Sequence, residues 1–270
     1  MLKKFALIGK DIQKSFSPAI HSYCFKILSI KAKYDIIDIQ SPHQMVDVIK
    51  LLKDKELDGV NITAPYKRAF LKYIDQINPR AESIGAVNCI HSNQEKLIGN
   101  NTDWFGFAKS VENFKEYQSI IILGAGGAVL PILYYFKSRQ NCPIHIIARD
   151  SNKIRNLSGE NVFVHSIRDI NLNLNQCLII NAIPNAAKIE WNNIIPKLTS
   201  TPLCAMDLNY HLKVTNFLNY YSFKIQIKNG LDMLIYQALM SIDIWFNCNL
   251  TASINIEDLK KNINEQYYDK

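Results

Sequence analysis

A lysine that follows two hydrogen-bonding side chains is the first place where residue types and spacing could support chemistry. Asn61 and Thr63 stand two residues apart at the end of a strand-like segment, so the twofold repeat of a strand puts both side chains on one side. Lys67 follows shortly after Pro65. This group would suit a ligand with several hydroxyl groups, although an Asn/Thr/Pro stretch is also ordinary turn chemistry.

A glycine-rich turn, Gly124 to Ala128, is the second such place. It lies between an apolar segment typical of a strand, 120–123, and one typical of a helix, 129–136. Glycines here let the backbone approach a pyrophosphate, whose charge then lies at the helix N-terminus. A plain tight turn is the alternative. Val129 stands where a third small residue is usual, which predicts slightly wider packing of the helix on the strand.

Charged residues after the next strand bear on the choice of dinucleotide. An acidic residue at this place accepts a hydrogen bond from the ribose of NAD, whereas a basic residue accommodates the 2′-phosphate of NADP. The predicted strand ends at Ala148, and Arg149, Asp150 and Lys153 come next. These residues leave both cofactors open, and simple loop charge is the other interpretation.

Composition excludes several classes of protein. The 270 residues are 48% hydrophobic and 20% charged, which is typical of a globular protein rather than a disordered or low-complexity one. The net charge of +7 comes from lysines and arginines that are scattered, with no run of five. We therefore expect neither nucleic acid nor a membrane surface as a partner.

Cysteine and histidine spacing argues against a metal centre. The six cysteines stand singly and the six histidines do not cluster at ligand spacing, so we expect free thiols in a reducing cytoplasm and no metal site. The uncharged segment 119–136 reaches the lower length limit of a membrane span. Three glycines and Pro131 interrupt it, which favours a buried strand, turn and helix.

Strand and helix patterns alternate along the chain, which predicts an α/β protein with largely parallel sheets. Helices are predicted to start at Ser17-Pro18, Ser41-Pro42 and Val129, and a long one covers 231–246. Ser92-Asn93 is the predicted turn of a hairpin. The predicted strands are 5–8, 34–39, 59–63, 87–90, 96–98, 120–123, 144–148, 162–165, 177–181, 203–208 and 223–227.

Taken in order, the motifs of the chain resemble those of the shikimate dehydrogenase family, whose members reduce 3-dehydroshikimate with NADPH. The matching blocks run from residue 9 to residue 237, so the resemblance covers nearly the whole chain. The blocks are Gly9, Ser15-Phe16-Ser17-Pro18 with His21, Asn61 to Lys67, Gly85 to Asn88, Gly99 to Asp103 with Gly106, Gly124 to Ala128, Asn181 to Pro184, Asp207 with Tyr210, and Gly230 to Leu234 with Gln237.

The resemblance implies two domains with a cleft between them. An open α/β substrate domain would consist of residues 1–103 and 231–270, and a Rossmann-type NADP-binding domain would consist of residues 104–230. It also implies a cytoplasmic enzyme of chorismate and aromatic amino acid biosynthesis. Such an enzyme would be a monomer or homodimer that binds shikimate and 3-dehydroshikimate.

The resemblance also implies a role for each matching residue. Lys67 would be the proton donor and acceptor, with Asp103 as its catalytic partner. The implied substrate-binding residues are Ser15, Ser17, Asn61, Thr63, Lys67, Asn88, Asp103, Tyr210 and Gln237. The implied cofactor-binding residues are Gly124, Ala125, Gly126, Gly127, Ala128, Ala148, Arg149, Asp150, Lys153, Asn181, Ile183, Leu208, Gly230 and Met233.

Departures from the family pattern keep alternatives open. The family usually has Asn-Arg-Thr where this chain has Ala148-Arg149-Asp150, and Ile183 replaces a threonine. The added carboxylate leaves room for NAD beside NADP, and so for an NAD-using quinate/shikimate dehydrogenase. A non-catalytic dinucleotide-binding protein is the alternative from another class, and the intact Lys67 and Asp103 argue against it.

Overall fold

A computed structural model of the chain describes residues 2–114, 116–139, 142–168, 170, 172–184, 187, 189–198 and 201–269. The chain divides into two compact units. The first unit is Met1–Phe107 with Leu234–Lys270, and the second is Ala108–Met233. The sequence places the two boundaries near 103 and 230, a few residues before those of the structure.

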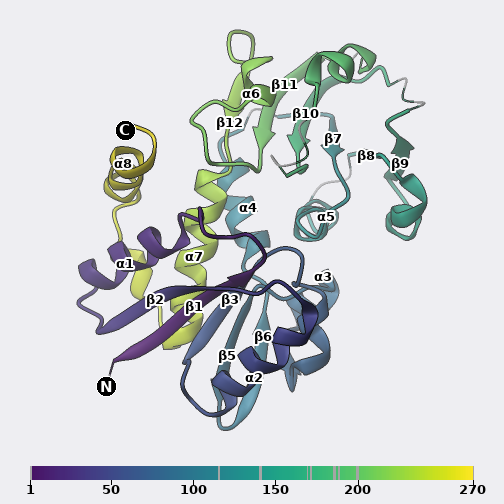
Figure 1. The fold of residues 1–270 in the computed structure, drawn as a ribbon. Coiled ribbons are helices and arrows are strands. Elements are labelled where there is room, and N and C mark those ends of the chain that lie inside the picture. The colour runs from purple at the N-terminus through teal and green to yellow at the C-terminus, as the bar shows by residue number, and fades with distance from the viewer. Residues whose placement is uncertain are drawn as a thin grey trace. The chain divides into compact units, whose positions relative to one another are not determined.

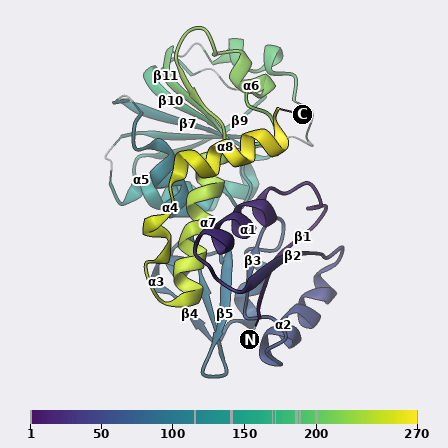
Figure 2. The same ribbon diagram turned by 90° about the vertical axis from the view of Figure 1, so that its left-hand side faces the viewer.

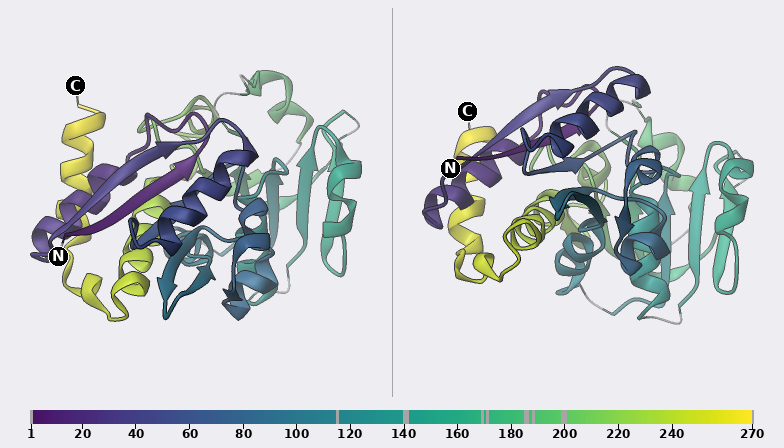
Figure 3. Two further views of the ribbon diagram at one scale, coloured as in Figure 1. Left: turned by 60° about the horizontal axis from the view of Figure 1, so that its bottom comes forward. Right: turned by 90° about the horizontal axis from the view of Figure 1, so that it is seen from below.

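The first unit contains a mixed six-stranded sheet in the order β2-β1-β3-β5-β6-β4. β1 pairs in parallel with β2 and β3, and the paired arrows of β1 and β2 lie side by side in both views of Figure 3. β5 is antiparallel to β3 and β6. The strands are β1 (Lys3–Gly9), β2 (Ala32–Asp38), β3 (Gly59–Ile62), β4 (Gln76–Ile77), β5 (Cys89–Asn93) and β6 (Lys96–Asn100).

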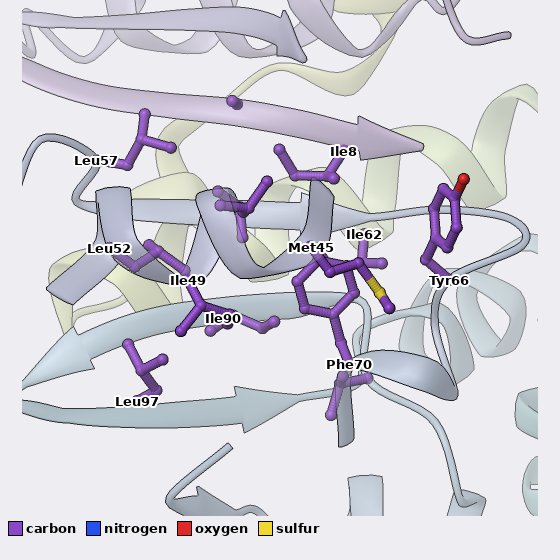
Figure 4. Close-up of a cluster of buried hydrophobic side chains, with 14 of the residues drawn as sticks. Ile8, Met45, Ile49, Leu52, Leu57, Ile62, Tyr66, Phe70, Ile90 and Leu97 are labelled. Carbon is purple, nitrogen blue, oxygen red and sulfur yellow. The ribbon is translucent and has the colours of Figure 1, made fainter. Parts of the chain in front are cut away.

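Amphipathic helices cover this sheet. In α2, Met45, Ile49 and Leu52 lie on one helical face and pack in a buried cluster with Ile62 and Phe70 (Figure 4). The spacing of these apolar residues explains why the segment is helical and which face it buries. The helices of the first unit, two of which continue into the second, are α1 (Ser17–Ile27), α2 (Met45–Lys53), α3 (Pro79–Ile84), α4 (Asp103–Val111), α7 (Leu231–Phe246) and α8 (Ile256–Tyr267).

The second unit contains a parallel six-stranded sheet in the order β12-β11-β10-β7-β8-β9 (Figure 1). Numbered along the chain, this is the strand order 6-5-4-1-2-3 of dinucleotide-binding folds, so the predicted α/β class with a Rossmann-type part is confirmed. The elements are β7 (Ser119–Leu123), α5 (Val129–Lys137), β8 (Ile144–Ala148), β9 (Val162–Ser166), β10 (Asn175–Asn181), β11 (Thr201–Asp207), α6 (Asn216–Asn219) and β12 (Gln226–Lys228).

The uncharged segment 119–136 folds as the predicted strand, turn and helix. All five residues of β7 are buried, which explains its continuous apolar sequence, because a central parallel strand is covered on both faces. Within the part of the chain that the structure describes, no helix has the length and apolar character needed to cross a membrane.

Three local predictions are wrong. The Ser17-Pro18 signal predicts Ser17 as the helix cap and Pro18 as the first helical residue, but Ser17 is the first residue of α1 and Phe16 takes the capping position. The hairpin turns at Gln94 and Glu95, since β5 continues to Asn93, which pairs with Lys96. The last strand is Gln226–Lys228 rather than 223–227. Its expected start is an exposed turn in which the Lys224 amide donates to the Tyr221 carbonyl.

Four of the described α-helices, α3, α4, α6 and α8, escape the sequence prediction. In α3 and α8 the capping signals are present in the sequence. In α3 the Asn78 side chain accepts a hydrogen bond from the Arg80 amide, and Pro79 follows the cap. In α8 the Asn255 side chain accepts from the amides of Glu257 and Asp258. Both helices are polar in sequence, so hydrophobic periodicity alone does not reveal them.

Candidate active site

Lys67 and Asp103 form an ion pair in the first unit. Lys67 lies in the loop after β3, and Asp103 is the first residue of α4. The Lys67 Nζ atom is 2.7 Å from Asp103 Oδ2, and the two side chains are 15% and 7% exposed. The Val87 amide donates to the Lys67 carbonyl at 3.0 Å.

The pair keeps unused hydrogen-bonding capacity. Among the described residues, Asp103 is the single hydrogen-bond partner of Lys67 Nζ, which has three hydrogens to donate. Asp103 Oδ2 accepts this bond, so Oδ1 can accept another from a ligand hydroxyl. The arrangement can therefore hold an oxygen-rich ligand and transfer a proton at Nζ.

Asn88, Thr102 and Gln237 form a buried hydrogen-bond network beside this pair. Asn88 Oδ1 accepts from the Thr102 amide at 2.6 Å, and Asn88 Nδ2 donates to Thr102 Oγ1 at 2.9 Å. Asn88 Nδ2 also lies 3.4 Å from Gln237 Oε1. Thr102 precedes Asp103, so the network fixes the backbone where α4 begins.

Asn61 is a further member of this network. Its Oδ1 accepts from the Tyr34 hydroxyl at 2.9 Å, and its Nδ2 donates to the Ser241 hydroxyl at 2.9 Å and to the Asn88 carbonyl at 3.1 Å. Both amide hydrogens are thus used within the protein, and the residue is 3% exposed. This arrangement favours a supporting role for Asn61 over direct contact with a ligand.

Sequence reasoning assigns no role to three members of the network, namely Thr102, Ser241 and Tyr34, although Thr102 lies within a matching block. Ser241 lies four residues after Gln237 on α7, and its hydroxyl donates to the Gln237 carbonyl at 2.9 Å. The four-residue spacing on one helix face was a usable signal. Tyr34 lies on β2, and no feature of its sequence context marks it as a partner of Asn61.

The two serines of the loop before α1 lie close together. Ser15 Oγ donates to Ser17 Oγ at 3.2 Å and accepts from the Ser17 amide at 3.2 Å. Ser15 is half-buried and Ser17 is buried. Thr63 is half-buried after β3, and its methyl group packs so closely on Gly9 that a side chain at residue 9 would collide with it.

His21 connects the serine loop to the network. Its Nδ1 lies 2.8 Å from the Ser17 carbonyl, which makes Nδ1 the protonated nitrogen of a neutral ring. The ring stacks on Tyr34, with centroids 3.8 Å apart. Full burial lowers the pKa of His21 to about 4, because desolvation penalises the charged imidazolium.

In the second unit, the carboxyl ends of four parallel strands align. Leu123 pairs with Ile147 and with Asn181, and Asn181 pairs with Asp207. Ligands of open α/β sheets bind beyond this edge, where the strand order reverses. Here the reversal lies between β7 and β10, next to the glycine turn.

The glycine turn exposes its backbone at that edge. Gly124 has φ of +116°, and a side chain there would press on the Ala182 carbonyl, so glycine is required. Gly126 and Gly127 are exposed, with open space where a Cβ would be. The backbone amides of these two glycines, which precede the N-terminus of α5, are not covered by side chains. A pyrophosphate could therefore approach them, so these residues fit a dinucleotide.

The residues predicted to select the dinucleotide follow β8. Ala148 is buried as the last residue of the strand, whereas Arg149 and Asp150 are exposed. The side chain of Lys153 lies outside the described part of the structure, so the prediction for it stands on the sequence. Among the described side chains, Arg149 and Asp150 are therefore the predicted groups that could distinguish NADP from NAD.

Asp207 organises the loops after β10 and β11. Its carboxylate accepts from Asn181 Nδ2 at 2.9 Å, from Asn209 Nδ2 at 2.8 Å and from Thr215 Oγ1 at 2.5 Å. Burial raises the pKa of Asp207, and these hydrogen bonds oppose that shift. Asn181 Oδ1 also accepts from the Ile183 amide at 3.0 Å, so Asn181 supports its loop from a buried position.

The remaining predicted residues lie at the same edge of the second unit. Leu208 and Tyr210 are half-buried, and Met233 is 9% exposed. A side chain at Gly230 would collide with the Leu208 carbonyl, which explains the glycine. Tyr210 belongs to the second unit, whereas the other predicted substrate residues belong to the first.

Comparison with known proteins identifies a family. Residues 7–90 match a family model described as the shikimate dehydrogenase substrate binding domain. A protein of Clostridium botulinum named shikimate dehydrogenase (NADP(+)) is 35% identical over 246 residues, which cover 88% of this chain and 95% of the relative. A protein of the same name from Caldicellulosiruptor saccharolyticus is 30% identical over 279 residues, which cover 96% of this chain and 98% of that relative.

Solved structures agree with the sequence relatives. The crystal structure of shikimate dehydrogenase 1 from Peptoclostridium difficile is 28% identical to this chain, with a TM-score of 0.80. The match covers 98% of this chain and 97% of that one. The likeness therefore extends over both units rather than over the dinucleotide fold alone.

The Tyr34 hydroxyl is expected to stabilise the first unit through Asn61. Tyr34→Phe removes the donor to Asn61 Oδ1 and leaves that buried oxygen unsatisfied, so we expect the free energy of unfolding to fall by about 1–3 kcal/mol. Denaturant unfolding followed by fluorescence measures this change. Tyr73→Phe is the matched control, because no hydrogen bond of the Tyr73 hydroxyl is found among the described residues. Equal losses in the two variants would contradict the assignment.

His21 is expected to make stability depend on pH. The unfolded chain binds a proton near the ordinary pKa of 6.5 and the folded chain near 4, so stability falls as pH drops from about 6.5 to about 4. The full effect is about 3 kcal/mol. We expect His21→Asn to reduce the difference in unfolding free energy between pH 8 and pH 5. His43→Asn, at an exposed site, should leave that difference unchanged, and an unaltered slope in the His21 variant would refute the assignment.

Proposed function

We propose, from the premise that this chain belongs to the shikimate dehydrogenase family, that it catalyses the reversible NADPH-dependent reduction of 3-dehydroshikimate to shikimate. The observation that carries the proposal is the ion pair of Lys67 and Asp103, with Nζ and Oδ2 2.7 Å apart. Both residues fall at the positions that the family motifs assign to the catalytic pair. The reaction belongs to the biosynthesis of chorismate and the aromatic amino acids.

Lys67 supplies the proton in the proposed reaction. When bound, the reduced nicotinamide supplies a hydride to the carbonyl carbon. The Lys67 ammonium donates a proton to the carbonyl oxygen as negative charge develops there, so ketone, hydride and proton together give the alcohol. In the oxidation of shikimate, neutral Lys67 accepts the hydroxyl proton. Asp103 holds Nζ in place before the transfer.

Other first-unit residues would recognise the substrate. Ser15 and Ser17 supply hydroxyl groups for the carboxylate, and Asp103 Oδ1 accepts from a ring hydroxyl. Asn88, Thr63 and Gln237 complete the expected hydroxyl contacts. A buried polar group left without its partner costs about 1–3 kcal/mol, so several such contacts discriminate among polyols. Asn61 is proposed to support Asn88 rather than to touch the substrate.

Second-unit residues would hold the dinucleotide. The amides of Gly126 and Gly127 would bind the pyrophosphate at the start of α5, and Arg149 with Lys153 would bind the 2′-phosphate. Leu208, Gly230 and Met233 would line the nicotinamide side. Asp150 is the one observation that favours NAD. The relatives named above are NADP(+) enzymes, so NADP is the proposed cofactor.

The remaining proposals concern the setting of the enzyme. Isolated free cysteines agree with a reducing cytoplasm, which we propose as its location. A monomer or homodimer is the proposed assembly, to be measured by sedimentation or light scattering.

One assay tests the function directly. Purified protein is mixed with shikimate or quinate and with NADP or NAD, and the absorbance of reduced cofactor is followed. We expect the fastest reduction with shikimate and NADP. Absence of a signal in all four mixtures would overturn the proposal, and faster reduction with quinate and NAD would favour the alternative dehydrogenase.

Lys67 is expected to be essential for turnover. Lys67→Ala should lower kcat by about 10² to 10⁴, because the developing alkoxide loses its proton donor. The KM for shikimate should change much less, and thermal unfolding should show that the variant is folded. Lys72→Ala, an exposed lysine nearby, is the matched control and should retain turnover. Full turnover by the Lys67 variant would refute its role.

Arg149 is expected to set the preference for NADP. Arg149→Ala removes a charged hydrogen-bond donor to the 2′-phosphate, a bond that contributes about 1.5–3 kcal/mol, so kcat/KM for NADP should fall about 10- to 100-fold. The value for NAD, which lacks the phosphate, should change little. Arg168→Ala, at an exposed site after β9, serves as the control. An equal loss with both cofactors would exclude this role.

A further inference from the structure

The last helix of the chain ends on the loop that carries Ser15 and Ser17. α8 lies beside α1 in the first unit, as Figure 2 shows. The ring of Tyr267, the last residue of α8, stacks on the ring of Phe16 with centroids 3.9 Å apart and planes at 24°. Tyr268 meets the same ring edge-on at 5.7 Å.

Phe16 is well placed to transmit this contact to the serines. It stands between them in sequence and is 4% exposed, so its ring is held among other groups. Its carbonyl accepts from the Ile20 amide at 3.1 Å, which starts the hydrogen-bond pattern of α1. A shift of the Phe16 backbone would therefore move Ser15, Ser17 and the start of α1 together.

Hydrogen bonds within the loop and the start of α1 hold the serine pair. The two hydroxyls lie 3.2 Å apart, the Ser17 amide donates to Ser15 Oγ at 3.2 Å, and the Ser17 carbonyl accepts from His21 Nδ1 at 2.8 Å. The two contacts of the serine hydroxyls are long for hydrogen bonds, at 3.2 Å. The conformation of the loop therefore also depends on how its side chains pack. The stack of Phe16 on Tyr267 supplies that packing.

α8 is anchored independently of the stack. Leu259 and Ile263 are fully buried on one face, and Asn255 caps the helix start by accepting from two backbone amides. The helix can therefore hold Tyr267 in a fixed position against Phe16. Removing the Tyr267 ring should loosen the serine loop without unfolding the helix.

We propose that Tyr267 and Tyr268 are positioning residues for the carboxylate of the substrate, acting through Phe16 on Ser15 and Ser17. The inference rests on the proposed function, in which these serines bind that carboxylate. A loop ordered before binding loses less conformational entropy when the ligand binds, so the stack favours substrate affinity. The Lys67 and Asp103 pair is not part of this contact, so the chemical step should be unaffected.

The test separates substrate affinity from turnover. Tyr267→Ala should raise the KM for shikimate about 2- to 10-fold, the range expected from loss of one aromatic pair. The kcat and the KM for NADP should stay within about twofold, and Tyr267→Phe should restore the wild-type KM because the ring is kept. Gln266→Ala, on an exposed position of the same helix, is the matched control.

A double-mutant cycle shows whether Tyr267 acts through the serines. If it does, Tyr267→Ala should raise the KM much less in a Ser15→Ala background than in the wild type. Fully multiplicative effects would overturn the inference, as would an unchanged KM in Tyr267→Ala or a failure of Tyr267→Phe to restore it. An inactive wild type would instead overturn the proposed function, so the two failures are distinguishable.

Discussion

A buried hydrogen-bond network around Asn88 is the constraint on which the first unit depends. Tyr34, Asn61, Asn88, Thr102 and Ser241 come from distant parts of the chain, yet each is buried and each bonds to another member. A buried amide without a partner is costly, so these segments can meet in few other arrangements. The network fixes Thr102, and thereby places Asp103 at the start of α4 beside Lys67.

In the second unit, a single buried carboxylate, that of Asp207, fixes the backbone in the same way. Asp207 accepts hydrogen bonds from Asn181, Asn209 and Thr215, so polar groups from the end of β10 and from the loop after β11 surround one buried carboxylate. Because the strand ends are aligned by backbone pairing, this carboxylate shapes the edge where the glycine turn also lies. In both units, buried polar groups set the backbone, and less constrained groups at the edge are left for ligands.

The sequence predicts the parts of this arrangement that depend on local chemistry. Strands such as 120–123 and the helix after the glycine turn follow from apolar runs and turn residues, which act within a few positions. Asn61 shows where such reasoning stops. Its type and its place at a strand end suggest a ligand contact. Its partners Tyr34, Asn88 and Ser241 are distant in sequence, and together they use its amide oxygen and both of its amide hydrogens. The prediction of a strand that starts at Phe223 fails for a related reason. An aromatic residue favours a strand, but Phe223 is 96% exposed in a turn.

Hydrogen-bond saturation distinguishes supporting residues from binding residues within one motif. Asn61 and Lys67 belong to the same block, but Asn61 has used both of its amide hydrogens on the protein and Lys67 has used one of three. Ligand recognition needs groups that the fold holds in place and leaves partly unpaired. The pair of Lys67 and Asp103 meets both conditions. Each side chain is held by the other, and among the described residues nothing else bonds to the second carboxylate oxygen or to the other two ammonium hydrogens. That combination, rather than residue type alone, makes the pair the centre of the proposed chemistry.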